Sequence, residues 1–331
     1  MRNKALRHIL AFPAQLVGVN NLLALSGKKL VLPFYHTVSN QPLAHISPLY
    51  KHKRVDEFEA DLDFLLQHFS PISLEEVFLY RKGELALQKP SFHLSFDDGL
   101  REVFTVAKPI LKARGVPATI FVNPDFVGNK ALFFRYKAAL LIQELMHSGI
   151  DELTEFPFDS KIKTVNAWKK WILSAKHNQS KQLDELAILL NVDFDSFLKK
   201  EKPYLEIPEL KILQEEGFAI GAHSMNHPEY QYLNEEEQLQ QTLESMAWVQ
   251  QHFPQKITAF SFPFTDFGVR KSFFEQLSSN PKRPDLLFGT AGLNEGINEF
   301  HLQRSPMELG ISAKQMYETD LLYFILKNFC I

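Results

Sequence analysis

The sequence predicts an α/β fold in which parallel strands alternate with helices and close into an incomplete, distorted (β/α)7 barrel. Short apolar runs alternate with segments whose apolar residues recur at helical spacing, a pattern typical of parallel strands with crossover helices. Seven such runs can be traced, and several of them end in polar side chains. The chain has 331 residues, of which 45% are hydrophobic, enough to bury a sizeable core in one large domain or two small ones.

The seven expected strands are short, and their carboxyl ends carry most of the polar residues of interest. They span residues 30–35, 91–96, 118–122, 218–222, 257–262, 286–289 and 301–303. The second of these strands ends in two aspartates, and the fourth leads directly into two histidines. Because parallel strands place their carboxyl ends on one face of a barrel, we expect these groups to lie together there.

The expected helices begin and end at recognisable signals. Ser73 with Glu76 three residues later forms a capping-box pattern at a helix start. Gly115 and Pro117 are stop signals after another helix. Beyond the helix that begins near Ser73, helices are expected from about residue 55, over 103–114, from Asn234 to about residue 253, and over 313–328.

Two stretches fall outside the strand–helix alternation. Residues 131–205 predict polar amphipathic helices without clear strands, which we interpret as a helical insertion within one barrel domain of residues 29–331. In residues 1–28, Arg2, Lys4 and Arg7 precede an apolar stretch that polar residues and Pro13 interrupt. This stretch is a poor match to a secretion signal and suits an amphipathic helix lying on the domain or on a membrane face.

The charge balance and the cysteine content limit the classes of binding partner that we expect for this chain. The chain has 36 basic and 39 acidic residues, a net charge of -3, and this balance gives no indication of nucleic-acid binding. Cys330 is the single cysteine, so no intramolecular disulfide is possible and secretion gains no support. We expect a cytoplasmic protein that can contact a membrane peripherally.

Adjacent carboxylates follow the second strand in the segment from Ser95 to Gly99. Asp97 and Asp98 repel each other at this strand end unless something binds them, and strand ends are where barrel active sites lie. A plain turn is the alternative interpretation, because aspartates cap turns and Gly99 can adopt a positive φ.

A histidine pair follows the fourth strand. His223 and His227 are four residues apart, so their imidazoles can converge on one metal ion. With Asp98 they would form a set of two histidines and one carboxylate that leaves open positions for water and substrate. The alternative is a pair of unrelated loop histidines.

A third segment, Phe260 to Thr265, also runs from a strand into a loop. Pro263 fixes the backbone there, so the N–H that follows could point at a developing oxyanion. Most Phe-Pro-Phe segments simply belong to a core, so this motif carries little weight by itself.

Together these motifs resemble the polysaccharide deacetylase (NodB-homology) family, the fourth family of carbohydrate esterases. Asp97-Asp98-Gly99, the pair His223 and His227, and the Pro263 loop occur in the family's order and rough spacing. The opening segment of residues 34–38 also resembles the family's frequent N-terminal strand. The resemblance covers most of the chain apart from residues 1–28 and the insertion, and it implies a distorted barrel of the glycoside hydrolase/deacetylase type.

The resemblance also implies roles for single residues. Asp97 matches the family's general base, and Asp98, His223 and His227 match its metal ligands, with Zn²⁺ the commonest ion and Co²⁺ or Ni²⁺ as alternatives. Phe264 occupies the position whose backbone N–H helps to hold the oxyanion. The chemistry agrees, because an amide is a poor electrophile and needs a metal to polarise its carbonyl and a carboxylate to accept a proton from water.

The chain departs from the family pattern at two catalytic positions. Ser261 stands where many members have an arginine that contacts the catalytic aspartate. Arg304 could supply that charge from a neighbouring position, and the alternative is that it forms an ion pair at the surface or at the edge of the core. The family's late histidine, which acts as the general acid, has no clean match. His301 is the candidate for it, although its spacing differs. His36 leaves the first strand on the same face and could line the cleft, or could be a hydrogen-bonded strand-end residue.

The sequence therefore predicts a metal-dependent hydrolase that removes N-acetyl groups from an amino sugar in a polysaccharide or a lipid-linked glycan. An O-acetyl esterase, a hydrolase of a non-sugar amide, and a glycan-binding module that retains the metal remain as alternatives. A segment rich in aromatic residues within the insertion, Leu132 to Tyr136, would suit a substrate near a membrane.

Overall fold

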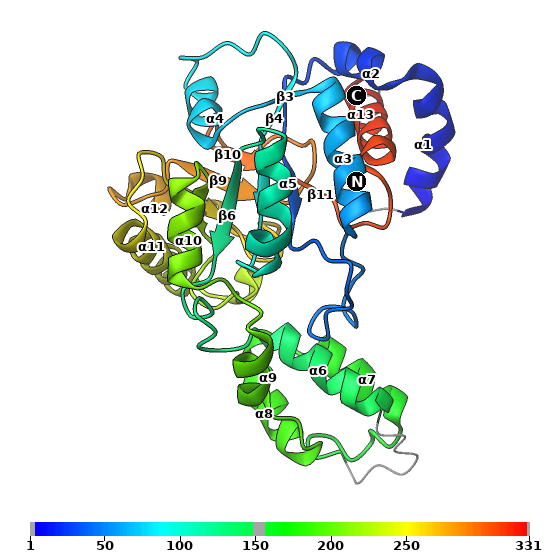
Figure 1. The fold of residues 1–331 in the computed structure, drawn as a ribbon, viewed down its shortest axis with the longest axis vertical. Helices are drawn as coiled ribbons and strands as arrows, with labels where there is room; N and C mark the ends of the chain where they lie inside the picture. The colour runs from blue at the N-terminus through cyan, green and yellow to red at the C-terminus, as the bar shows by residue number, and fades with distance from the viewer. Residues whose placement is uncertain (1–3, 148–155, 330–331) are drawn as a thin grey trace.

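The structure, a computed structural model, describes residues 4–147 and 156–329, so Cys330 lies outside the described residues. Its centre is an eight-stranded parallel sheet in the order β10-β9-β8-β7-β6-β5-β2-β11 (Figure 1). The strands of this sheet are β2 (Pro33–Tyr35), β5 (Leu94–Phe96), β6 (Ala118–Val122), β7 (Ala219–Ala222), β8 (Ala259–Ser261), β9 (Leu286–Gly289), β10 (His301–Gln303) and β11 (Ser305–Pro306).

One interrupted segment nearly closes this sheet into a barrel. β10 pairs with β9, and β11 pairs with β2 at the opposite edge. Only Arg304 separates β10 from β11, and its N–H donates to the Gly289 carbonyl while the next N–H, of Ser305, donates to Leu32. The expected barrel is therefore confirmed, and its last strand runs to Pro306, further than the sequence indicated.

Two of the expected strands are divided in the structure. Their first halves, β1 (Leu30–Val31) and β4 (Ser91–Phe92), form a separate three-stranded sheet with β3 (Ser70–Pro71), in the order β1-β4-β3. Their second halves are β2 and β5 of the barrel. β3 was not expected, because two residues carry no periodic pattern.

The capping and stop signals named in the sequence coincide with helix boundaries, whereas the helix over residues 271–279 was not expected. The Ser73 hydroxyl accepts a hydrogen bond from the backbone N–H of Glu76, and the Asn234 amide oxygen accepts one from that of Glu237, as in a capping box. Outside the insertion and the N-terminal segment, the helices are α3 (Val55–His68), α4 (Leu74–Arg81), a π-helical turn (Val103–Ala107) continued by α5 (Lys108–Ala113), α10 (Ile207–Glu215), α11 (Glu235–His252), α12 (Lys271–Ser279) and α13 (Ala313–Phe329).

Two groups of helices lie outside the barrel ring. The insertion projects from it at the bottom of Figure 1 and consists of α6 (Phe134–His147), α7 (Val165–Ser174), α8 (Ser180–Leu189) and α9 (Phe194–Glu201). It has its own hydrophobic core around Trp168, which also takes in Ile46 and Leu100 from barrel loops. At the other end of the molecule, α1 (Lys4–Val17) and α2 (Val19–Ser26) pack on α13.

Candidate active site

The polar groups singled out in the sequence come together at the carboxyl ends of neighbouring strands. Asp97 and Asp98 follow β5, and His223 follows β7. Pro263 and Phe264 lie in the loop after β8. Parallel pairing places these ends on one face of the barrel, which is the face that carries the active site in barrel enzymes.

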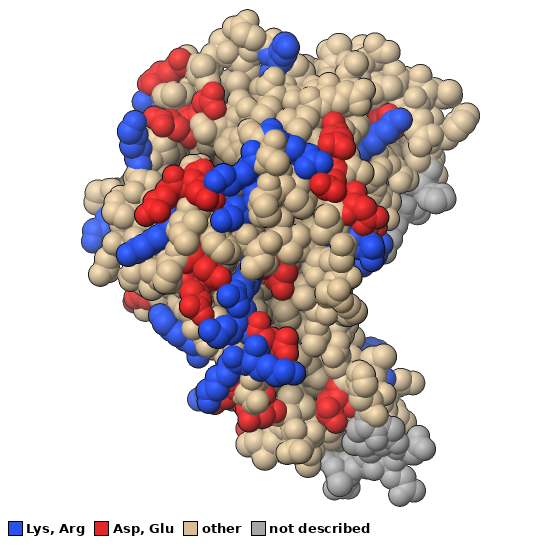
Figure 2. Space-filling view, viewed as in Figure 1, with Lys and Arg blue, Asp and Glu red and all other residues tan. Residues whose placement is uncertain are grey.

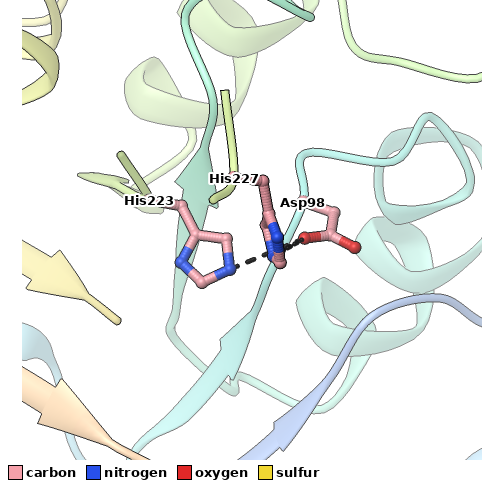
Figure 3. Close-up of side chains that lie close together, drawn as sticks. All are labelled: Asp98, His223 and His227. Atoms are coloured by element: carbon pink, nitrogen blue, oxygen red, sulfur yellow. Dashed lines mark ion pairs between the residues drawn. The ribbon is translucent and has the colours of Figure 1, made fainter. Parts of the chain in front are cut away.

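Asp98, His223 and His227 form a compact buried cluster, and Figure 3 shows both imidazoles directed toward the carboxylate. The Nε2 atom of His227 lies 3.2 Å from Asp98 Oδ1, and that of His223 lies 3.5 Å from the same oxygen. One ligand atom from each residue lies within 4.8 Å of the other two. The three side chains are at most 6% exposed, so no shell of water screens them.

Neighbouring groups fix the orientation of this cluster. The Nδ1 atom of His223 lies 2.8 Å from the Ser261 carbonyl and donates to it, which leaves Nε2 as a lone-pair donor facing Asp98. Burial lowers the pKa of His223 to about 4, so the ring is neutral at neutral pH. A carboxylate oxygen and two imidazole nitrogens that converge in this way are a donor set that fits zinc and related divalent ions.

Asp97 is held in a bidentate ion pair with Arg304. The two guanidinium nitrogens Nη1 and Nη2 each lie 2.7 Å from one carboxylate oxygen of Asp97. They also donate to the hydroxyls of Ser95 at 2.9 Å and Ser261 at 2.5 Å. The guanidinium thus occupies the space beside Ser261, and it reaches this space from the junction of β10 and β11.

The surroundings of Arg304 explain how a buried cation is accommodated. Arg304 is 1% exposed, and its guanidinium carbon lies 4.3 Å from the ring centre of Phe34, with Phe121 and Phe288 also close. Burial opposes ionisation of Asp97, but the positive charge of Arg304 more than offsets this and lowers the pKa of Asp97. Asp97 is therefore a carboxylate at neutral pH, as a general base must be.

The backbone of the site is strained at several non-glycine residues. Asp98, Ser224, His227 and Phe264 all have φ between 57° and 69°. At Phe264 the Thr265 N–H donates to the Pro263 carbonyl at 2.6 Å, which makes a three-residue turn of the rarer type with positive φ. Such conformations persist where the surroundings enforce them, and their concentration here supports a functional site.

His36 lies at the edge of the same site and forms a pair with a carboxylate that the sequence did not suggest. Its Nδ1 contacts Glu308 Oε2, and its backbone N–H donates to Glu308 Oε1 at 3.1 Å. Burial disfavours the charged imidazole, but the negative charge of Glu308 outweighs this and raises the pKa of His36 to about 9. The side chain is 28% exposed, so it can reach a ligand.

The insertion forms one wall of the site. The Tyr136 hydroxyl, from α6, donates to Asp98 Oδ2 at 2.8 Å. The Phe133 ring lies 4.4 Å from that of His227 and 6.0 Å from that of Phe264. The hydrophobic residues from Leu132 to Tyr136 are at most 5% exposed, and this segment packs against His227 and Asp98, so it lines the site and forms no exposed apolar surface.

His301 does not join the site, which corrects its assignment as the general acid. Side chains alternate along a strand, and Arg304 points into the barrel while His301 points outward. There the His301 ring stacks on Phe274 of α12 at 5.0 Å between ring centres and lies 3.3 Å from Asp266 Oδ2. It is fully buried in this position and contacts neither Asp97 nor the metal ligands.

Two contributors were missed in the sequence for different reasons. Glu308 follows β11, so the rule that polar residues after strands line the site would have found it had β11 been expected. Tyr136 lies in the insertion, 38 positions from Asp98, and no local pattern links the two residues. Only the packing of the insertion against the barrel brings them together.

A groove of about 980 Å³ opens beside the cluster. Phe34 and Phe264 line it, whereas none of the three clustered residues Asp98, His223 and His227 does. The groove continues along α13 to Arg7 of α1 and carries both aromatic and polar side chains, including Phe267, Asp266 and Tyr323.

Comparison with known proteins agrees with the geometry. The polysaccharide deacetylase family model matches residues 85–187 and 190–276, which is more than half of the chain. Comparison with curated proteins finds no match. Among solved structures, Streptococcus pyogenes deacetylase PplD is 16% identical with a TM-score of 0.55, over 88% of this chain and 97% of that one. IcaB from Ammonifex degensii is 16% identical with a TM-score of 0.55, over 90% of this chain and 98% of that one.

A polysaccharide deacetylase from Bacillus cereus is also similar, with 12% identity and a TM-score of 0.53 over 88% of this chain and 69% of that one. At these identities the solved structures establish a shared fold. The family match rests on the sequence itself and includes both the aspartate and the histidine motifs. The chain therefore belongs to the polysaccharide deacetylase family and is a hydrolase of carbon–nitrogen bonds other than peptide bonds.

Proposed function

We propose that the protein is a metal-dependent deacetylase that removes N-acetyl groups from an amino sugar in a polysaccharide or a lipid-linked glycan. The observation that carries this proposal is the convergence of Asp98, His223 and His227 beside an ionised, arginine-paired Asp97. Zinc is the proposed ion, and cobalt or nickel would suit the same ligands. A bound divalent cation supplies Lewis acidity, which polarises the amide carbonyl and lowers the pKa of a water molecule.

The residues of the chain then divide the remaining work. Asp97 accepts the proton of the attacking water, and Arg304 keeps this carboxylate ionised and fixed in position. The backbone N–H of Phe264, held in its strained turn, donates to the oxyanion that forms from the carbonyl oxygen. Preorganised donors of this kind lower the barrier because they need no reorientation as charge develops.

His36 is the proposed proton donor to the leaving amine, in place of His301. Its pairing with Glu308 keeps the imidazole protonated at neutral pH, and its side chain is more exposed than the buried metal ligands. Amide hydrolysis needs such a donor, because an amine leaves as a neutral group only after nitrogen gains a proton.

The similar Streptococcus pyogenes deacetylase was solved in complex with acetate, the acid that deacetylation releases. We therefore propose acetate as the released product here. The groove beside Phe264 supports a glycan as the substrate, because it offers aromatic faces together with hydroxyl, amide and carboxylate groups.

Acetate release after metal removal tests this proposal. The protein is stripped with a chelator, supplied with zinc, cobalt or nickel, and incubated with oligomers of N-acetylglucosamine. We expect release only with added metal and none from Asp98→Asn. Release from acetylated xylan but not from the N-acetylated oligomers would instead indicate an O-acetyl esterase, and silence on all acetylated glycans would reject the proposal.

A further inference from the structure

The first helix exposes an apolar stripe to solvent. Ile9, Phe12 and Leu16 are 68%, 69% and 73% exposed, and their spacing places them on one face of α1. Leu25 of α2 is 60% exposed as well. A helix on the surface of a globular protein ordinarily turns a polar face outward, whereas α1 is apolar on its outward face as well as on its buried face.

The opposite face fixes how these helices sit on the protein. Ala14 of α1 and Leu22 of α2 are fully buried, and both belong to the hydrophobic core of the barrel side. The Arg7 guanidinium lies 2.9 Å from a carboxylate oxygen of Asp320 in α13. The outward direction of the stripe is therefore set by packing and by an ion pair with the body of the protein.

The charge of the N-terminal segment differs from that of the rest of the chain. Residues 1–29 contain five Lys and Arg residues and no Asp or Glu, and the first acidic residue is Asp56, although the whole chain has a net charge of -3. Lys29, at the end of this segment, is exposed. The outer edge of the molecule over α1 and α2, at the upper right of Figure 2, is mostly free of acidic side chains. Arg7 and Lys28 are paired with Asp320 and Glu295 of the protein body, so the segment keeps an excess of positive charge even after these pairs are counted. An excess of positive charge beside an apolar stripe matches the chemistry of an anionic lipid surface.

The shape of the helix pair indicates how it would meet a bilayer. Within the described residues no single helix is long and apolar enough to cross a membrane, but α1 and α2 together pass that test across a bend of 93°. A pair bent this sharply suits lying in the interface better than spanning it. The groove is lined by Phe264 and also by Arg7 of α1, so a glycan held at the lipid surface would lie close to the site.

We propose that α1 and α2 dock the protein on an anionic bilayer surface through Ile9, Phe12, Leu16 and Leu25. These side chains enter the boundary between headgroups and acyl chains, and the exposed Lys29 contacts lipid phosphates. The docking places the mouth of the groove at the membrane surface. It is independent of the reaction that the site carries out.

Co-sedimentation of the full chain with vesicles tests the docking. We expect binding to vesicles of phosphatidylcholine mixed with phosphatidylglycerol, weaker binding to pure phosphatidylcholine, and a loss of about tenfold or more in the triple variant Ile9→Ser, Phe12→Ser, Leu16→Ser. The matched control replaces three exposed apolar residues of the insertion, Met146→Ser, Ile188→Ser and Leu189→Ser, and should bind like the unchanged protein.

Several results would overturn the docking proposal: no binding to either vesicle, equal binding to both, or equal binding by the triple variant. A dimer that dissociates in the triple variant, seen by light scattering without lipid, would assign the stripe to a second copy instead. Should the triple variant fail to fold, Phe12→Trp gives a second measurement. Its added fluorescence should shift to shorter wavelength with anionic vesicles, and an unchanged spectrum would reject the docking.

Discussion

The strand ends of the barrel and the helical insertion enclose the same cluster but contribute different groups. The barrel supplies every charged group of the reaction, including Asp97, Asp98 and Arg304, and much of the strained backbone. The insertion supplies neutral aromatic groups, of which Tyr136 contacts Asp98 and Phe133 contacts His227. The difference indicates that the proposed chemistry depends on residues of the barrel, whereas the insertion holds the clustered side chains in place and shields them from water.

The assignment of the proposed chemistry to the barrel is tested most directly at Asp97. Asp97→Asn removes the proton acceptor but keeps the shape, so we expect kcat for acetate release to fall by about 10²–10⁴-fold. Zinc binding should persist, because Asp97 is not one of the three clustered ligands. A rate within about tenfold of the unchanged protein would assign the base to another group.

The next largest effect is expected at Arg304. Arg304→Met leaves the Asp97 carboxylate buried without its partner, and the free energy of unfolding should fall by about 3–5 kcal/mol. Denaturant unfolding measures this loss, and the rate of acetate release should fall with it. Arg304→Lys keeps a charge but loses the bidentate geometry, so it should recover part of the stability. An unchanged rate and pH profile in Arg304→Met would remove Arg304 from the mechanism.

The contribution of the insertion to zinc binding is tested at Tyr136. Tyr136→Phe removes the hydrogen bond to Asp98 Oδ2, and we expect zinc affinity to fall by about tenfold or more, measured by competition with a chelator. Tyr204→Phe is the matched control, since Tyr204 is buried in the same wall and its hydroxyl accepts from the Phe133 N–H instead. Equal zinc affinities in both variants would mean that the insertion only covers the site.

The smallest effect at neutral pH is expected at Glu308. His36 has a pKa raised to about 9, so it is protonated at neutral pH and loses its proton as the pH rises through that value. If it donates the proton, the rate should fall on the alkaline side. Glu308→Gln removes the charge that raises the pKa, so this fall should begin at lower pH, while the rate well below neutrality changes little. If the rate of Glu308→Gln falls at the same alkaline pH as that of the unchanged protein, His36 is not the proton donor.

The barrel and the gathering of its charged groups on one face could be predicted from the sequence. Short local patterns identify the strands, and the charged residues directly follow them. Arg304 could be suspected for the same reason, although its bidentate contact with Asp97 depends on the closing segment between β10 and β11. His301 was assigned wrongly, since its direction depends on strand register, which spacing alone does not fix. Tyr136 could not be found, because its contact is set by packing between distant segments.

The most direct test is a count of zinc ions per chain after removal and reloading of metal. The account predicts one tightly bound zinc in the unchanged protein, and the loss of that ion in Asp98→Ala, His223→Ala and His227→Ala, with folding checked by circular dichroism. A protein that binds no divalent ion, or three variants that each retain it at full stoichiometry, would contradict it.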